Sequence, residues 1–225
     1  MSAMNDFHFS DHGYGATHND PELEDLDSIN YVSHLTQAWI NERAAPDILQ
    51  YEQLAVDGLL AKIEEQTAAI DELDSGSDTL MIISILYQTE LERVKFVLRS
   101  YLRTRISKIE RFCEYILSNE DKRFERLSTA ERTYAQKATR QHYHSSFLSS
   151  LPQSLQLQSD IVFDRRLSMV SKPNIDEAVF CRIVSHIGQY QIDDDDEAFL
   201  EPGQIFIFRY GAIRSLLEEG KIELI

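Results

Sequence analysis

Hydrophobic residues recur every three or four positions through most of the first 150 residues, which is the spacing of amphipathic helices. The longest such run is uninterrupted from residue 78 to about residue 117. About forty residues at roughly 1.5 Å each form a rod on the order of 60 Å long, about twice the diameter of a small domain. The pattern therefore predicts a long helix that needs packing partners along its length.

Two shorter helical runs precede the long one. The first covers residues 27–45 and ends at Pro46, because proline lacks an amide donor and restricts the residue before it. The second covers residues 49–73, and a polar turn at residues 74–77 separates it from the long helix.

A fourth helix is expected after a polar loop at residues 119–127. Ser128 and Glu131 have the spacing of a capping box, in which each side chain binds the other residue's backbone amide. This helix is expected to extend to about Leu148. Together the four runs predict an α-helical domain over residues 28–150.

The composition changes after residue 150. Residues 151–173 are polar and contain prolines, and they exceed the length of a normal loop in a compact domain, which indicates a partly docked interdomain linker. Residues 174–225 contain short β-branched and aromatic runs separated by turn residues, which predicts a small β-rich domain. The predicted fold class is α+β, a mainly α-helical bundle domain followed by this small β-rich domain.

The β-rich domain has little interior of its own. Its expected strands lie within residues 177–185, 204–210 and 221–225, with a short helix at 212–220 before the last strand. Ile205 and Ile207 would lie on one side of the middle strand, with Phe206 and Phe208 on the other. A module of about fifty residues is marginal on surface-to-volume grounds. We therefore expect one of its faces to pack on the helical domain or on a partner.

Charge restricts the possible partners. The chain has 22 Lys and Arg against 38 Asp and Glu, a formal net charge of −16, so its summed field repels phosphate polymers. Residues 1–27 hold seven acids and no Lys or Arg, which predicts a disordered acidic tail that serves solubility or docks on a partner. A local exception is the basic ridge, residues 93–111, where seven basic residues alternate with acids. We favour a solvated helix face there, and a nucleic-acid-binding module or an acidic helical adaptor is the alternative.

Arg105 stands out within the long helix. At about 100° per residue it falls inside the apolar stripe, whereas Arg103 falls on the polar side. One interpretation is an arginine whose methylenes cover apolar surface while its head reaches water. The other is an ion pair with a carboxylate on a neighbouring helix or subunit.

The sequence contains no recognisable active site. It has no phosphate-binding glycine loop, no dinucleotide-binding glycine motif and no zinc-protease motif. His142 and His144 would point in different directions on a helix, and residues 193–196 lack the spacing of a calcium loop. Cys113 and Cys181 fit burial as small hydrophobic residues, and no run approaches the roughly eighteen apolar residues of a membrane span. We expect no enzyme activity, no cofactor and no metal.

Several segments resemble a known family over about residues 28–225. The sequence segments are LTQAWINERAAPDILQY at 35–51, ELERVKFVLRSYLRTRISKIERF at 90–112, the LP and KP pairs at 151 and 172, and the terminal AIRSLLEEGKIELI. Together they are similar to the SLD-type subunit, the fifth SLD protein, of the GINS complex.

This resemblance implies a nuclear scaffold without catalytic activity. It implies a heterotetramer with three other GINS subunits, which joins the MCM hexamer and an accessory subunit as the eukaryotic CMG replicative helicase at replication forks. In some relatives the N-terminal segment docks on a replisome hub protein. The interface candidates are Trp39, Arg43, Leu98, Tyr101, Arg105, Ile109, Phe206, Phe208, Leu224 and Ile225.

Overall fold

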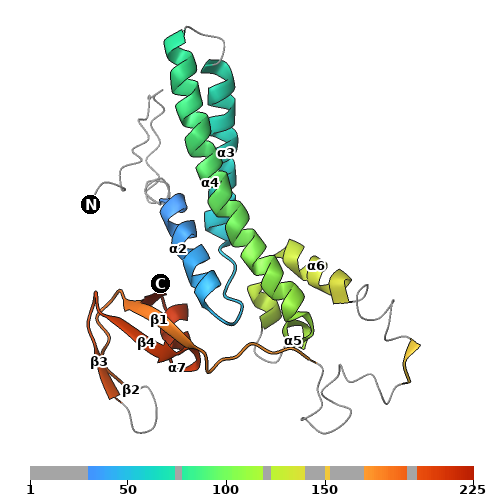
Figure 1. Ribbon diagram of the computed structural model, residues 1–225, viewed down its shortest axis with the longest axis vertical. Helices are drawn as coiled ribbons and strands as arrows, with labels where there is room; N and C mark the ends of the chain where they lie inside the picture. The colour runs from blue at the N-terminus through green and yellow to red at the C-terminus, as the bar shows by residue number, and fades with distance from the viewer. Residues whose placement is uncertain (1–29, 74–77, 119–122, 140–149, 153–169, 192–196) are drawn as a thin grey trace, which may run out of the picture. The chain divides into compact units, whose positions relative to one another are not determined.

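The computed structural model describes residues 30–73, 78–118, 123–139, 150–152, 170–191 and 197–225 (Figure 1). All its helices except the last precede its antiparallel sheets, which confirms the α+β class. The helices are α2 (Tyr31–Ala44), α3 (Gln53–Leu73), α4 (Asp78–Arg111), α5 (Cys113–Leu117), the 3₁₀ helix η1 (Arg123–Arg126), α6 (Thr129–Thr139) and α7 (Tyr210–Glu218). The strands are β1 (Ala178–Ile183), β2 (Gly188–Gln191), β3 (Glu197–Leu200), β4 (Ile205–Arg209) and β5 (Ile222–Leu224).

The domain boundaries expected from the sequence stay a prediction. The acidic tail at residues 1–27, most of the linker, the histidine pair at 142 and 144, and the acidic run at 193–196 lie outside the described residues. Residues 31–225 cluster as one compact unit, so contacts between the helices and the sheets can be described.

The long helix ends earlier than the sequence pattern predicts. The 34 residues of α4 make a rod of roughly 50 Å. Phe112 then leaves the helical conformation at φ −117° and ψ 26°, and α5 begins at the next residue. The break buries Phe112, Cys113 and Ile116 in one core, a gain that periodicity alone does not reveal.

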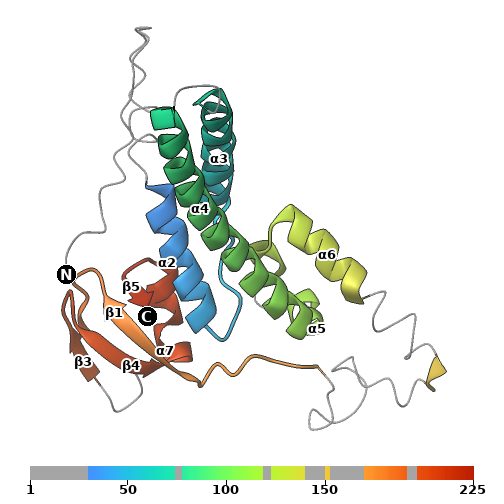
Figure 2. The same cartoon turned by 45° about the horizontal axis from the view of Figure 1, so that its top comes forward.

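Two cores lie along α4. In the first, α2 and α3 pack on α4, and α3 runs beside its N-terminal half (Figure 1, Figure 2). Its buried members are Leu35, Ala55, Val56, Leu59, Val97, Leu98 and Tyr101. The second core forms where α5, α6 and the C-terminal end of α4 meet, and it includes Ile48, Ile109, Cys113, Ile116, Leu127 and Ala135.

The capping box at the start of α6 is confirmed. The Ser128 amide donates to Glu131 Oε2 at 2.9 Å, and the Glu131 amide donates to Ser128 Oγ at 3.2 Å. The preceding polar loop is partly helical, because residues 123–126 form η1. α6 is described to Thr139, so its expected extension to Leu148 lies outside the described residues.

The C-terminal domain is a three-stranded antiparallel sheet in the order β4-β1-β5 with a separate β2–β3 hairpin. The three strands and the helix predicted from sequence are confirmed, with α7 beginning at Tyr210. The β2–β3 hairpin was missed, because its four-residue strands carry too few β-branched residues to stand out. Tyr190 Oη fastens the hairpin to α7 by donating to the Ala212 carbonyl at 2.8 Å.

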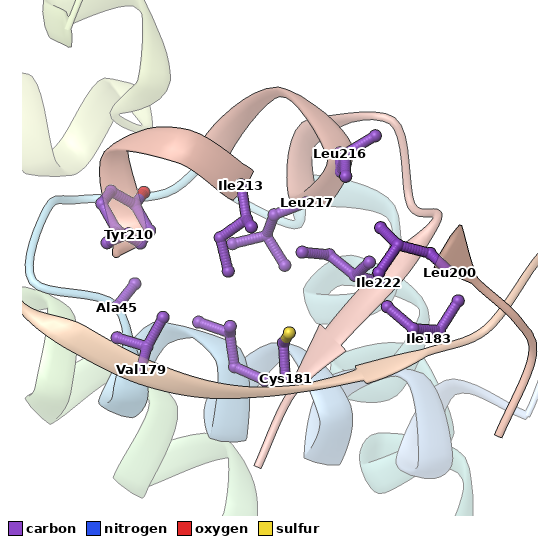
Figure 3. Packing of buried hydrophobic residues seen from close by; sticks show 11 residues of the cluster. Ala45, Val179, Cys181, Ile183, Leu200, Tyr210, Ile213, Leu216, Leu217 and Ile222 are labelled. Atoms are coloured by element: carbon purple, nitrogen blue, oxygen red, sulfur yellow. The ribbon is translucent and has the colours of Figure 1, made fainter. Parts of the chain in front are cut away.

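One face of the three-stranded sheet is a core and the other is exposed. Val179, Cys181 and Ile183 point toward α7, where they meet Ile213 and Leu217 (Figure 3). Cys181 lies opposite Phe206 on β4 and Leu224 on β5. Phe206 and Phe208 stack 5.2 Å apart at the edge of this core.

Candidate assembly site

The extended segment between α2 and α3, Ala45–Glu52, meets three cores and is called the connection segment below. Ala45 is buried in the C-terminal core, Ile48 in the α5–α6 core, and Tyr51 packs on the α2–α3–α4 core. The sequence placed a helix start at Leu49, but α3 begins at Gln53. Because the segment is neither helix nor strand, its backbone groups need side-chain partners.

Arg105 supplies one of those partners, the donor to the Leu49 carbonyl. It is 0% exposed, and all five of its guanidinium N–H donors are used. Its donors reach Glu131 at 2.8 and 3.1 Å, Glu42 at 3.0 Å, and the carbonyls of Leu49 at 2.9 Å and Arg126 at 3.1 Å. Of the two interpretations left open for Arg105, the structure therefore shows the ion pair, and both carboxylates belong to this chain.

Lys108, one turn further along α4, adds a second buried cation. Its Nζ donates to Glu42 Oε1 at 2.9 Å, to the Glu42 carbonyl, and to the Asp47 carbonyl at 2.8 Å. Burial lowers the pKa of Lys108, and Glu42 opposes that effect. Burial also acts to lower the pKa of Arg105 and is the largest single effect on it, but the hydrogen bonds to Glu131 and the nearby negative charges together outweigh it, so that pKa is raised. Two cations and two carboxylates form this central charge network.

Glu131 has two tasks in the network. Its Oε2 accepts from the Ser128 amide at 2.9 Å and from Arg105 at 3.1 Å. The first turn of α6 is thereby held against α4 by the same carboxylate that caps it. The Cζ atom of Arg105 lies 5.2 Å from the centre of the Tyr51 ring and 5.7 Å from the centre of the Tyr101 ring. These contacts add cation–π attraction at a buried site.

A second charge network joins the connection segment to α7. Asp47 is 1% exposed, and its Oδ2 lies 3.3 Å from Arg214 and 3.7 Å from Arg126. Glu218 completes the network, at 2.6 Å from Arg126 and 3.3 Å from Arg214. These contacts attach the C-terminal domain to the helices.

The last strand is attached to α2 by direct hydrogen bonds. The Leu224 amide donates to Asn41 Oδ1 at 2.8 Å, and Gln37 Nε2 donates to the Leu224 carbonyl at 3.2 Å. The outer edge of β5 is therefore covered by α2 side chains.

Of the interface candidates, five are used inside the chain. Leu98, Tyr101, Arg105, Ile109 and Leu224 are each less than 9% exposed, so they can affect a partner only by shaping this chain. Phe206 and Phe208 are half-buried, and Ile225 is exposed. Their role at an interface stays a prediction.

Trp39 and Arg43 form a different kind of surface. The Arg43 guanidinium lies 5.5 Å from the Trp39 ring, and the exposed Phe96 meets that ring edge-on at 6.2 Å. Tryptophan and arginine are enriched among residues that dominate binding energy. Both stay candidates for a partner contact.

Sequence reasoning missed the partners of Arg105. Glu42 is seven residues after the buried Leu35 and so lies on the same face of α2, a spacing that could have marked it as buried. Glu131 was recognised only as a cap. Asp47 gave no periodic signal, because it lies in an extended segment.

Tyr101 and Tyr210 are both buried, but their hydroxyl groups differ in hydrogen bonding, so their replacement by phenylalanine should have different effects. Tyr101 Oη accepts from the Glu52 amide at 3.1 Å, whereas no hydrogen bond to Tyr210 Oη is found among the described residues. We expect Tyr101→Phe to lower the free energy of unfolding at pH 7 by about 1–2 kcal/mol, and Tyr210→Phe to leave it unchanged or raise it. Urea pulse proteolysis, read as the intact band of this chain, measures both; equal losses would contradict the assignment.

Stability is expected to fall above pH 10. Burial raises the pKa of Tyr51, Tyr101 and Tyr210 above the ordinary value of 10.0, so the folded state keeps protons that the unfolded state loses. Their contribution is complete below pH 10 and is lost as pH rises beyond it. The lowered pKa of Lys108 acts in the opposite direction on stability, because here the unfolded state binds the proton more tightly than the folded state. This cost to stability disappears as pH rises through the ordinary value of 10.5.

Tyr101→Phe should flatten the alkaline fall in unfolding free energy by up to about 1.4 kcal/mol per pH unit. Pulse proteolysis at several pH values between 9 and 11.5 measures the slope for the unsubstituted chain and for Tyr101→Phe. An unchanged slope for Tyr101→Phe would count against this linkage.

The N-terminal half of α4 exposes many large apolar side chains. Met81, Ile82, Ile85, Leu86 and, further along, Phe96 project within one arc of α4 at about 100° per residue. With the exposed Tyr87 and two residues of α3, Leu54 and Leu60, they make up what we call the α3–α4 apolar surface. Apolar groups gathered in this way mark interaction sites on soluble proteins.

The basic ridge is largely neutralised by carboxylates. Arg93 pairs with Glu90, and both Lys95 and Arg99 pair with Glu92 at 3.1 Å and 3.0 Å. Arg105 and Lys108 are the buried cations of the central charge network, so five of the seven basic residues have acidic partners. This leaves little free positive charge for a phosphate backbone.

The described residues hold neither a metal-ligand cluster nor a membrane-spanning helix. Within the described residues, no group of three or more His, Cys, Asp or Glu side chains could hold a metal ion. None of the helices in the described part is long and apolar enough to cross a membrane. Cys113 and Cys181 are buried and are not joined in a disulfide, as their apolar surroundings predicted.

Comparison with known proteins matches both halves of the chain. Residues 58–142 match the family described as "GINS complex protein helical bundle domain", and residues 173–225 match "DNA replication complex GINS protein SLD5 C-terminus". A Schizosaccharomyces pombe protein named "DNA replication complex GINS protein sld5" is 38% identical over 200 residues, covering 87% of this chain and 92% of that protein. The chain belongs to the GINS SLD5 family.

Other SLD5 proteins are similar over the same extent. The Chaetomium globosum protein is 37% identical over 86% of this chain and 90% of its own length. The Arabidopsis thaliana protein is 34% identical over 91% of this chain and 95% of its own length. Both are named "DNA replication complex GINS protein SLD5". The SLD5 resemblance inferred from the sequence is thus confirmed, and the SLD5 C-terminal match contains all five strands.

Proposed function

We propose that this chain is a non-catalytic scaffold subunit of a heterotetrameric GINS complex. The observation that carries the proposal is the α3–α4 apolar surface, which a free subunit would expose to water. A helical face of this kind is stable in solution when a partner covers it. The family match supports other GINS subunits as the class of partner, and we propose three of them.

The proposal extends to the replicative helicase. Relatives are named as DNA replication complex proteins. We propose that the tetramer acts in the nucleus, where it helps assemble and hold the MCM hexamer and its accessory subunit for initiation and elongation. The acidic N-terminal tail, if it docks, would engage a replisome hub protein.

The two charge networks suit a scaffold role. They hold three cores and the C-terminal sheet around one connection segment, so the surfaces that partners meet keep a fixed geometry. Arg105, Glu42 and Asp47 would then act on assembly from within the chain. Trp39 and Arg43 would act at its surface.

Co-expression tests the proposal. We expect the chain produced alone to aggregate, and the chain produced with three GINS subunits to elute as a complex whose native mass fits one copy of each. A well-behaved monomer that ignores the other subunits would contradict the proposal.

The alternative, a nucleic-acid-binding module, has a distinct signature. Binding through the basic ridge would fall steeply with salt and would be lost in an Arg103→Ala, Arg111→Ala variant. The carboxylate pairs along the ridge favour the scaffold instead. Fluorescence anisotropy with single-stranded and duplex DNA at low salt separates the two.

A further inference from the structure

The exposed face of the three-stranded sheet is apolar across its whole width. Phe180 of β1 lies between Ile207 of β4 and Ile225, whose amide donates to the Phe180 carbonyl. Phe180, Ile207 and Ile225 are 55%, 57% and 48% exposed, and the adjacent Ile205 is 56% exposed. Four large apolar side chains thus form one strip that no other described residue buries.

The same strip ends at a strand edge that is open among the described strands. β5 is covered by Gln37 and Asn41, but β4 pairs with β1 alone. Backbone hydrogen bonds join Ile183 to Gln204 and Tyr210 to Glu177 at the two ends of the β1–β4 pair.

Between the Ile183–Gln204 and Tyr210–Glu177 hydrogen bonds, the direction of the β4 backbone groups follows from the alternation of the strand. In an antiparallel pair, every second residue directs its N–H and C=O toward the partner strand. The backbone N–H and C=O groups of Phe206 and Phe208 therefore point toward β1. Those of Ile205 and Ile207 point away from β1, at the open edge. The residues with exposed side chains are also the residues with outward backbone groups.

The charged residues on this exposed face are mainly basic, unlike those of the chain as a whole. Arg182 of β1 lies between Ile205 on β4 and Glu223 on β5, and Arg209 ends β4. Arg182 and Arg209 outnumber Glu223 here, so this part of the face is net basic, although the whole chain has a net charge of −16. This combination favours an occupant that brings alternate apolar side chains and acidic ones.

We propose that β4 is a docking edge for an extended segment of a partner protein, which adds a strand beside Ile205–Arg209. Main-chain hydrogen bonds to Ile205 and Ile207 would supply affinity, and apolar residues at alternate positions would cover the exposed strip. Acidic residues beside them would meet Arg182 and Arg209. A second copy of this chain fits less well, because two chains of the same large negative charge repel.

This inference goes beyond the proposed function, since the edge lies on the C-terminal sheet and not on the α3–α4 apolar surface. Its test uses the purified tetramer or, should the scaffold proposal fail, the chain in whatever soluble form it takes. The probes are ten-residue synthetic peptides with valine or isoleucine at alternate positions. One set has glutamate and threonine between them, and a matched set has lysine in place of glutamate.

Hydrogen exchange over residues 203–210 and peptide affinity are the two readouts. We expect the glutamate peptides to slow exchange there and to bind at least tenfold tighter than the lysine peptides. Ile207→Pro removes one outward donor without touching the β1–β4 bonds, and it should abolish the effect, whereas Ile207→Val should keep it. Arg182→Glu, which leaves the edge intact, should reverse the preference between the two peptide sets.

Each opposite result overturns the proposal. Absence of slowed exchange with any peptide, or equal affinity for both sets, would do so. Slow exchange that grows with protein concentration and needs no peptide would assign the edge to a second copy. Slow exchange that disappears on deletion of residues 1–27 would assign it to the chain's own N-terminal segment.

Discussion

Replacing Arg105 with alanine is expected to lower the free energy of unfolding by about 3–5 kcal/mol. The substitution leaves Glu42 and Glu131 as buried carboxylates with one cation, Lys108, which reaches only Glu42. It also removes the donors to the carbonyls of Leu49 and Arg126. A loss of this size is a large part of the stability of a typical domain.

Arg103→Ala is the matched control. Arg103 belongs to the same helix and carries the same side chain, but it is exposed. Its replacement should change the unfolding free energy by no more than about 0.5 kcal/mol. Urea pulse proteolysis on this chain at fixed tetramer concentration compares the two, and yield of tetramer should fall for Arg105→Ala alone. Equal effects of the two substitutions would contradict the role given to Arg105.

Placing two carboxylates on the α3–α4 apolar surface is expected to prevent assembly. Ile82 and Leu86 are 62% and 63% exposed and lie one turn apart on α4, so Ile82→Glu with Leu86→Glu adds no buried charge to the free chain. If sister subunits cover this surface, both carboxylates become buried without partners, which costs several kcal/mol. Because about 1.4 kcal/mol is a factor of ten, the affinity for the other subunits should fall at least a hundredfold.

The control adds the same charge elsewhere. Ala130 and Gln136 are exposed on α6, so Ala130→Glu with Gln136→Glu should assemble normally. Both double variants are co-expressed with the other three subunits and compared by native mass spectrometry. Normal assembly of the Ile82, Leu86 variant would remove the α3–α4 apolar surface from the interface.

Local signals in the sequence predicted much of the fold. The periodicity gave the helices, proline at position 46 gave the end of α2, and the Ser128–Glu131 spacing gave the cap of α6. Arg105 was predicted to be unusual because it interrupts an apolar stripe. These features depend on neighbours within a turn or two, and that is the range that a single sequence shows.

The remaining features depend on contacts distant in sequence. Glu42 and Arg105 are 63 residues apart, and no spacing rule connects them. The break at Phe112 occurs because α5 can pack on α6, which periodicity cannot report. The connection segment looked helical at Leu49, but its backbone carbonyls are bound instead by arginine and lysine side chains from α4 and η1.

The central claim is that sister subunits cover the exposed helical surface of this chain, and hydroxyl-radical footprinting of Met81 tests it most directly. Met81 is 57% exposed in the single chain and is readily oxidised, and the exposed Tyr134 on α6 provides a reference in the same sample. We predict that Met81 oxidation, relative to Tyr134, falls at least fivefold between the free chain, at a dilution where it is monomeric, and the assembled tetramer. Equal Met81 oxidation in the two states, with the tetramer intact, would contradict it.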